Sequence, residues 1–108
     1  MNCVTYARVS TEKQADKDLS IPAQLAAMRE YALAQKWVLV DEFVEPGATA
    51  TTADRPVLQR MLASISNANP TIDIVLVHKL DRMARNIEDH VAIRAALRKS
   101  GTRLASVT

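Results

Sequence analysis

Four short apolar stretches alternate with three helical stretches along all 108 residues, and this alternation constrains the fold more than any other feature of the sequence. The apolar stretches have the length and β-branched content of strands, and they cover residues 2–9 (NCVTYARV), 38–44 (VLVDEFV), 72–77 (IDIVLV) and 103–107 (RLASV). The order β-α-β-α-β-α-β with apolar strands predicts an α/β fold of three layers, in which helices cover both faces of a mostly parallel β-sheet. No repeat or Pro/Gly-rich linker divides the chain, so we expect one domain over residues 1–108.

The three helical stretches carry signals for their ends. They cover residues 20–37, 54–66 and 87–100. Ser20 and Asp54 are candidate caps of the first two helices, each with a proline in the first turn, and Gly101 is a candidate terminator of the third. In the second helix, an i, i+3, i+4, i+7 spacing predicts one buried stripe, made by Leu58, Met61, Leu62 and Ile65.

Polar residues gather after the first three expected strands. They are Arg8 and Ser10 at the carboxyl end of the first strand, Glu45 at the start of a loop (residues 45–53) after the second, and Lys79, Asp81, Arg82 and Arg85 in a loop (residues 78–86) after the third. Ligands of parallel α/β sheets bind outside the carboxyl ends of the strands. The sequence therefore predicts a functional site at this edge of the sheet.

The net charge of +2 hides an uneven distribution. Residues 1–78 carry seven basic and nine acidic side chains, whereas residues 79–108 carry seven basic and three acidic ones. A basic final quarter is compatible with a polyanionic partner, although a solvated helix face with scattered basic residues is the more common origin of such a pattern. Charge alone leaves both interpretations open.

A serine hydroxyl with arginines from three segments suits attack on a phosphodiester. Planar guanidinium groups match the equatorial phosphate oxygens, which carry the negative charge in the transition state. Arg82 and Arg85 stand at a helix start, where the dipole disfavours cations unless an anion is bound there. Taken singly, these residues also have structural interpretations: Ser10 as a turn residue, Asp81 as a helix cap, and Arg55 as the ion-pair partner of the aspartate before it.

Several other classes of protein are not indicated. The single Cys3 excludes an internal disulfide framework and fits a reducing cytoplasm, which is the expected location. Gly47 and Gly101 cannot make a P-loop or a dinucleotide fingerprint, and His78 and His90 lack metal-ligand spacing. No signal peptide is recognisable, and no apolar run approaches the roughly 20 residues that span a bilayer.

Four motifs resemble those of one enzyme family. YARVS resembles the nucleophile motif of the serine site-specific recombinases, the resolvase/invertase group, and the match extends in order through SIPAQ, DRPVL and KLDRMAR. These motifs cover residues 6–10, 20–24, 54–58 and 79–85, and together they are specific. SIPAQ and the ending LASVT look more like the large serine recombinases, which are phage integrases and transposon-borne enzymes. The expected domain is the N-terminal catalytic domain of such a protein.

The resemblance implies a covalent mechanism. Ser10 would attack a DNA phosphate, which gives a 5′-phosphoserine link and a free 3′-hydroxyl. Arg8, Arg82 and Arg85 would bind the scissile phosphate, lower the effective pKa of the hydroxyl and stabilise the transition state. Arg55 would assist from the junction between loop and helix.

Further residues are implied in supporting roles. Asp81 would orient an arginine or handle the proton of the leaving group, and these two roles remain open. Tyr6, Gln24 and Lys79 would support the site. Glu45 stands where the family often has an aspartate, so its role is open as well.

The resemblance also implies partners and cofactors. Double-stranded DNA would be the substrate, no small molecule would be one, and rejoining would need neither a metal nor ATP nor another cofactor. The family's catalytic domain normally continues into a long dimerisation helix and C-terminal DNA-binding domains, and the full-length protein acts as a homodimer and a synaptic tetramer. We therefore expect the 108 residues to be a truncated catalytic domain that cannot complete recombination alone.

Two alternatives remain. The chain could be a catalytically degenerate, DNA-associated domain of the same fold. It could also be a metal-dependent phosphoryl-transfer enzyme whose ligands are Asp41, Glu42, Glu45 and Asp81, although no motif supports this.

Overall fold

Strands and helices alternate along the chain in a computed structural model, which describes residues 1–8, 20–45, 55–79 and 87–108. The elements are β1 (Asn2–Arg8), α2 (Ile21–Ala34), β2 (Val38–Glu45), α3 (Pro56–Ser66), β3 (Ile74–Val77), α4 (Ile87–Lys99) and β4 (Arg103–Ser106). The order is the one that the sequence predicts, and the α/β class is confirmed.

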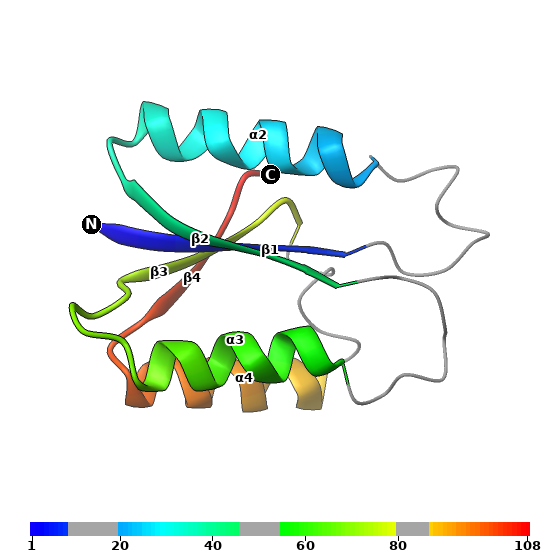
Figure 1. Cartoon of the computed structure of the whole chain (residues 1–108). Helices are drawn as coiled ribbons and strands as arrows, with labels where there is room; N and C mark the ends of the chain where they lie inside the picture. Colours follow the sequence, from blue (N-terminus) through cyan, green and yellow to red (C-terminus); the bar gives the residue numbers. More distant parts are fainter. Residues whose placement is uncertain (9–19, 46–54, 80–86) are drawn as a thin grey trace.

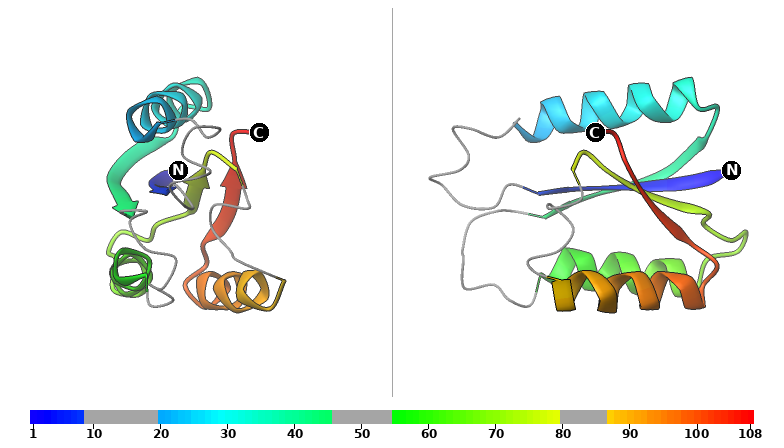
Figure 2. Two further views of the ribbon diagram at one scale, coloured as in Figure 1. Left: turned by 90° about the vertical axis from the view of Figure 1, so that its right-hand side faces the viewer. Right: turned by 180° about the vertical axis from the view of Figure 1, so that it is seen from behind.

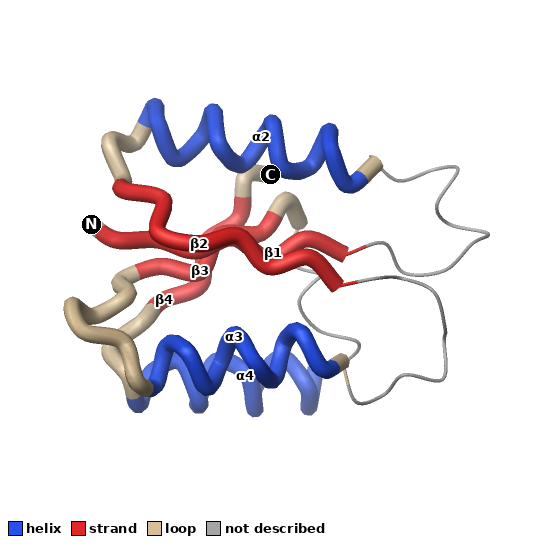
Figure 3. The backbone as a smooth tube through the Cα atoms, viewed as in Figure 1, coloured by secondary structure: helices blue, strands red, loops and turns tan. Residues whose placement is uncertain are grey.

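The four strands form one parallel sheet in the order β2-β1-β3-β4. Helix α2 covers one face of the sheet, and α3 and α4 lie side by side on the other (Figure 1, Figure 3). The end-on view in Figure 2 shows the resulting three layers. The predicted three-layer architecture is therefore confirmed.

The alternation of side chains along β1 divides the core into two clusters. Cys3 and Ala7 pack with Met28 of α2 on one face, whereas Val4 and Tyr6 pack on the face covered by α3 and α4. The central strand β3 is buried throughout, which explains its unbroken apolar sequence. The predicted stripe of α3 is confirmed, with three members fully buried and the fourth packed against them, namely Leu58, Met61, Ile65 and Leu62.

Helix α2 ends at Ala34, earlier than the predicted end at residue 37. Lys36 adopts a left-handed backbone with a φ of 63°, and the N–H of Trp37 donates to the carbonyl oxygen of Ala32 at 2.9 Å. This hydrogen bond closes the helix in the way that a left-handed residue allows. A lysine is an uncommon residue in this conformation, so the sequence carries no stop signal here.

Other boundaries differ from the prediction as well, and α4 and β4 each end one residue early. The N-cap of α3 is Arg55 rather than Asp54, which itself lies outside the described residues. Glu45 is the last residue of β2 rather than the start of a loop, and β3 begins at Ile74 rather than at residue 72. Gly101 has a φ of 70° after the last turn of α4, as predicted.

Candidate active site

The carboxyl ends of β1 and β2 meet at one edge of the sheet. The parallel register pairs Tyr6 with Phe43 and Arg8 with Glu45, so that the last residues of the two strands are neighbours. The N-termini of all three helices lie at this same edge (Figure 1). It is the edge at which the sequence predicts the functional site, and we call it the carboxyl edge.

Ten residues were predicted for the site, and the structure describes six of them. The described residues are Tyr6, Arg8, Gln24, Glu45, Arg55 and Lys79, whereas Ser10, Asp81, Arg82 and Arg85 lie outside the described residues. The predicted nucleophile therefore stays a prediction. The described residues nevertheless show how the carboxyl edge is built.

Glu45 is a buried carboxylate that holds the start of α3. Its side chain reaches from the end of β2, where the residue is only 4% exposed. Oε2 accepts a hydrogen bond from the N–H of Val57 at 3.1 Å, and Oε1 accepts one from the N–H of Leu58 at 3.0 Å. These are N–H groups of the first turn, which have no partner within a helix. Glu45 therefore caps α3 from a neighbouring strand and places an anion at its positive end.

Tyr6 adds a third donor to the same carboxylate. Its hydroxyl donates to Oε1 of Glu45 at 3.0 Å, and the tyrosine is fully buried. Burial raises the pKa of Tyr6, and the charge of Glu45 and this hydrogen bond raise it further. The positive charges of Arg8 and Arg55 lower the pKa of Tyr6. Tyr6 is thus a neutral donor that orients Glu45.

Arg55 forms a buried ion pair that the sequence did not reveal. Its Nη2 lies 2.7 Å from both carboxylate oxygens of Asp89, in the first turn of α4. The two side chains are only 5% and 15% exposed. From the sequence, Asp89 is one of two acidic residues that complement the dipole of α4, so no local signal distinguished it. The pair joins the starts of α3 and α4.

Gln24 and Lys79 occupy different parts of the carboxyl edge. Gln24 is buried in the first turns of α2, and its Nε2 donates to the backbone carbonyl of Arg8 at 3.4 Å. Arg8 is half-buried at the end of β1. Lys79 is exposed just beyond β3. The edge thus brings Arg8, Gln24, Glu45 and Arg55 together around the ends of β1 and β2.

The carboxylates considered for a metal site do not share one location. Glu42 forms an ion pair with Arg29 of α2, at 2.7 Å between Oε1 and Nη2, whereas Glu45 lies on the opposite face of the sheet. Asp41 is exposed and accepts a hydrogen bond from the N–H of Glu42. Asp81 lies outside the described residues. Within the described ranges, no group of three metal-binding side chains is present.

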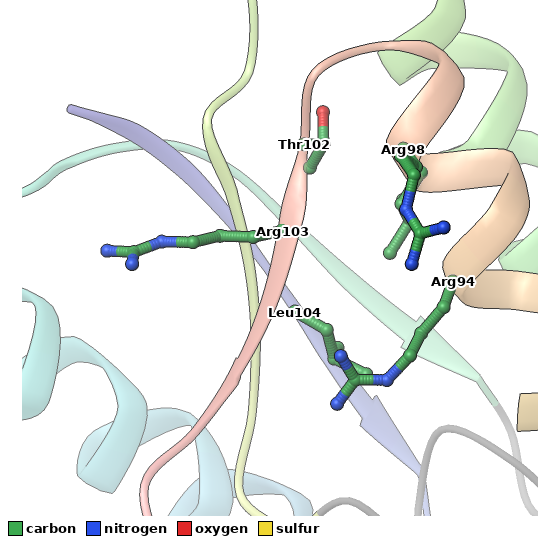
Figure 4. Close-up of a pocket in the computed structure, with 6 residues that line it drawn as sticks. Arg94, Arg98, Thr102, Arg103 and Leu104 are labelled. Carbon is green, nitrogen blue, oxygen red and sulfur yellow. The ribbon is translucent and has the colours of Figure 1, made fainter.

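A basic groove lies at the far end of α4. It encloses about 220 Å³ and is lined by Arg94, Leu97, Arg98, Thr102, Arg103 and Leu104. Figure 4 shows Arg94 and Arg98 on one side of β4, while Arg103 points to the other side. Arg98 belongs to the last turn of α4, where a cation complements the helix dipole. The groove is typical of a solvated basic face. It lies at the end of the sheet where β4 begins, which is opposite to the carboxyl edge.

None of the helices within the described ranges is long and apolar enough to cross a membrane.

Comparisons with known proteins agree with this architecture. A family model described as the resolvase N-terminal domain matches residues 3–108. The chain is also similar to "Uncharacterized immunity region protein 3" of Bacillus phage phi105, at 38% identity over 64 residues, which are 59% of this chain and 78% of the phage protein.

Solved structures share the whole fold. The N-terminal catalytic domain of TP901-1 integrase superposes with a TM-score of 0.82 at 29% identity, over 99% of this chain and 77% of that one. A resolvase family site-specific recombinase from Streptococcus pneumoniae gives a TM-score of 0.84 at 28% identity, over 99% of this chain and 72% of that one. The family model and these folds agree over nearly every residue, so the chain belongs to the resolvase family and has the fold of a serine recombinase catalytic domain.

Proposed function

We propose that this domain cleaves and rejoins double-stranded DNA during site-specific recombination, with Ser10 as the nucleophile. The observation that carries the proposal is the placement of Arg55, a buried cation at the start of α3, whose first turn Glu45 ties to the ends of β1 and β2. Its charge reaches Tyr6, and Arg8 ends the same strand two residues before Ser10. A phosphodiester at the carboxyl edge would meet guanidinium groups from two separate segments, one of which also binds Asp89.

In the proposed reaction, the Ser10 hydroxyl oxygen bonds to the phosphorus and the bond from phosphorus to the 3′ oxygen breaks. The hydroxyl proton leaves the serine, and a proton ends on the departing 3′ oxygen, so that a 5′-phosphoserine and a free 3′-hydroxyl result. Attack by a 3′-hydroxyl reverses these steps and rejoins the strand. The covalent link conserves the energy of the phosphodiester bond, so the proposed cycle needs no ATP. In the proposal, the arginines rather than a metal ion stabilise the charge on the phosphate.

The arginines would supply most of the electrostatic stabilisation. Arg8, Arg82 and Arg85 would bind the non-bridging oxygens, and Arg55 would assist them. One positioned donor in a site without water is worth roughly 3 kcal/mol of barrier. Asp81 would orient one of these arginines or handle a proton.

The described contacts support roles for the remaining residues. Tyr6 and Glu45 fix the start of α3 and with it the backbone of Arg55. Gln24 holds the carbonyl of Arg8. Exposed Lys79 would attract the DNA backbone without a fixed partner. The proposed assemblies of the full-length protein are a homodimer and a synaptic tetramer.

The test uses the full-length protein and a nicked DNA that carries its recombination site, in the presence of EDTA. We expect a covalent protein–DNA adduct that disappears in Ser10→Ala and persists in the control Ser64→Ala, which alters an exposed serine of α3. An adduct that persists in Ser10→Ala would remove Ser10 as the nucleophile. An adduct that forms only when EDTA is omitted would favour the metal-dependent alternative, and the absence of any adduct both with and without EDTA would favour the degenerate domain.

Arg82→Ala separates catalysis from folding. We expect the rate of adduct formation to fall by about 10²–10³-fold while the melting temperature changes little. A variant that is chiefly unfolded would assign Arg82 a structural role instead.

A further inference from the structure

The ion pair between Arg55 and Asp89 points to a residue that the proposed mechanism does not yet use. We propose that Asp89 is a positioning residue, which sets the direction of the Arg55 guanidinium toward the oxygens of a bound phosphodiester. This inference rests on the proposed function. It adds a residue from α4, an element that supplies no other part of the described site.

The hydrogen-bond geometry limits how the guanidinium can turn. A single nitrogen of Arg55, Nη2, donates to both oxygens of Asp89 at 2.7 Å. The guanidinium is planar and its N–H groups point in fixed directions, so anchoring one nitrogen restricts where the others point. Both side chains are largely buried, and in such surroundings a charged hydrogen bond is strong and its loss is costly.

The backbone at Arg55 gives a second, independent indication. Arg55 has a φ of 36° and a ψ of 71°, a left-handed conformation that costs a residue with a side chain about 1 kcal/mol or more. Glycine or asparagine would adopt it at lower cost at a helix N-cap. An arginine persists there because its surroundings hold it at both ends: Glu45 binds the N–H groups that follow it, and Asp89 binds its side chain.

Complementing the dipole of α4 does not account for this contact. Glu88 lies beside Asp89 in the same first turn and also complements the dipole, but it is exposed. Asp89 differs by reaching across to the start of α3. The neighbouring Glu88 is therefore a matched control, since its substitution removes the same charge from the same turn.

The experiment measures the single-turnover rate of adduct formation by the full-length protein at saturating DNA, together with the melting temperature of each variant. We expect Asp89→Asn to slow cleavage by about 10–100-fold, the size of effect that misplacing a charged group has on a reaction. Glu88→Gln is expected to stay within twofold of the wild type. A rate for Asp89→Asn equal to or above that of Glu88→Gln would overturn the inference.

A double substitution tests whether Asp89 acts through Arg55, while the melting temperatures report any loss of stability. If Asp89 acts through Arg55, then adding Asp89→Asn to Arg55→Met slows cleavage by less than twofold beyond Arg55→Met alone. An equal further loss in that background would show that Asp89 acts independently, and would overturn the inference.

A second substitution covers the case in which Asp89→Asn folds poorly. Arg55→Lys keeps the charge and an ion pair but loses the planar fork, so we expect near-normal stability and a slower reaction. A full rate in Arg55→Lys would show that the direction of the guanidinium is unimportant. Failure of the proposed function is distinguishable throughout, because the adduct would then be absent or would persist in Ser10→Ala, whereas failure of this inference leaves a Ser10-dependent adduct.

Discussion

Replacing Glu45 by alanine tests the network at the carboxyl edge most directly. The carboxylate accepts three hydrogen bonds, at 3.0 Å from the Tyr6 hydroxyl and at 3.1 and 3.0 Å from the N–H groups of Val57 and Leu58. In Glu45→Ala, all three donors lose their partner in a region where Glu45 is only 4% exposed. A buried donor without a partner costs about 1–3 kcal/mol.

Water can enter the space that the side chain leaves, so we take the lower part of that range for each donor. The three donors together then cost about 4 kcal/mol of the free energy of unfolding. This is a large fraction of the roughly 5–15 kcal/mol that stabilises a domain of this size. It corresponds to a fall in melting temperature of roughly 15–25 °C. The assay is thermal unfolding of the purified domain, followed by circular dichroism at neutral pH.

Glu42→Ala is the matched control, since it removes a carboxylate from the same strand. Glu42 forms an ion pair with Arg29, which is 55% exposed, so its loss should be much less costly than that of Glu45. Glu45→Gln retains one acceptor oxygen and should fall between the two. If Glu45→Ala melts within a few degrees of Glu42→Ala, the cap of α3 does not depend on this carboxylate and the reasoning is wrong.

Two further predictions concern stability. Because burial and Glu45 raise the pKa of Tyr6 above its ordinary value of 10.0, the stabilisation from the neutral hydroxyl is complete below that pH and is lost as the pH rises beyond it. Urea unfolding at increasing pH should show a larger alkaline loss in the wild type and in Tyr31→Phe than in Tyr6→Phe, where only other groups such as the buried Cys3 thiol, whose pKa is also raised by burial, contribute. An identical loss in Tyr6→Phe would contradict this prediction. Gly101→Ala should cost about 1 kcal/mol because the φ of Gly101 is 70°, although a Cβ there meets nothing within 4 Å. Gly101→Asn should melt above the alanine variant, and the opposite order would count against a backbone origin.

The order and type of the elements were predictable because their signals are local. The apolar run of β3 indicates a strand that is buried on both faces of the sheet. The stripe through Leu58, Met61 and Ile65 indicates a helix with one buried face. The family resemblance was predictable as well, because four motifs keep their order over the chain. Resemblance to both TP901-1 integrase and a resolvase family recombinase leaves the large serine recombinase class a prediction.

Element ends were less predictable where they depend on an uncommon backbone conformation. Lys36 closes α2 and Arg55 begins α3 in left-handed conformations, which sequence preference assigns to glycine or asparagine. Arg55 is held by contacts from Glu45 and Asp89, whereas Lys36 is exposed and is followed by the local hydrogen bond from the N–H of Trp37 to the carbonyl of Ala32. No rule of local preference would have placed these ends correctly.

The sequence by itself determined the fold class, the family and the edge of the sheet at which polar residues converge, because periodicity and motif order are properties of the chain alone. Only the tertiary structure decided which of these residues contact one another. The sequence predicts Glu45 as a loop residue, whereas in the structure its carboxylate caps α3. The sequence marks Asp89 only as a residue that complements a helix dipole, whereas in the structure it binds Arg55. Both contacts join segments well separated in sequence, and their strength comes from burial, which depends on how the helices pack against the sheet.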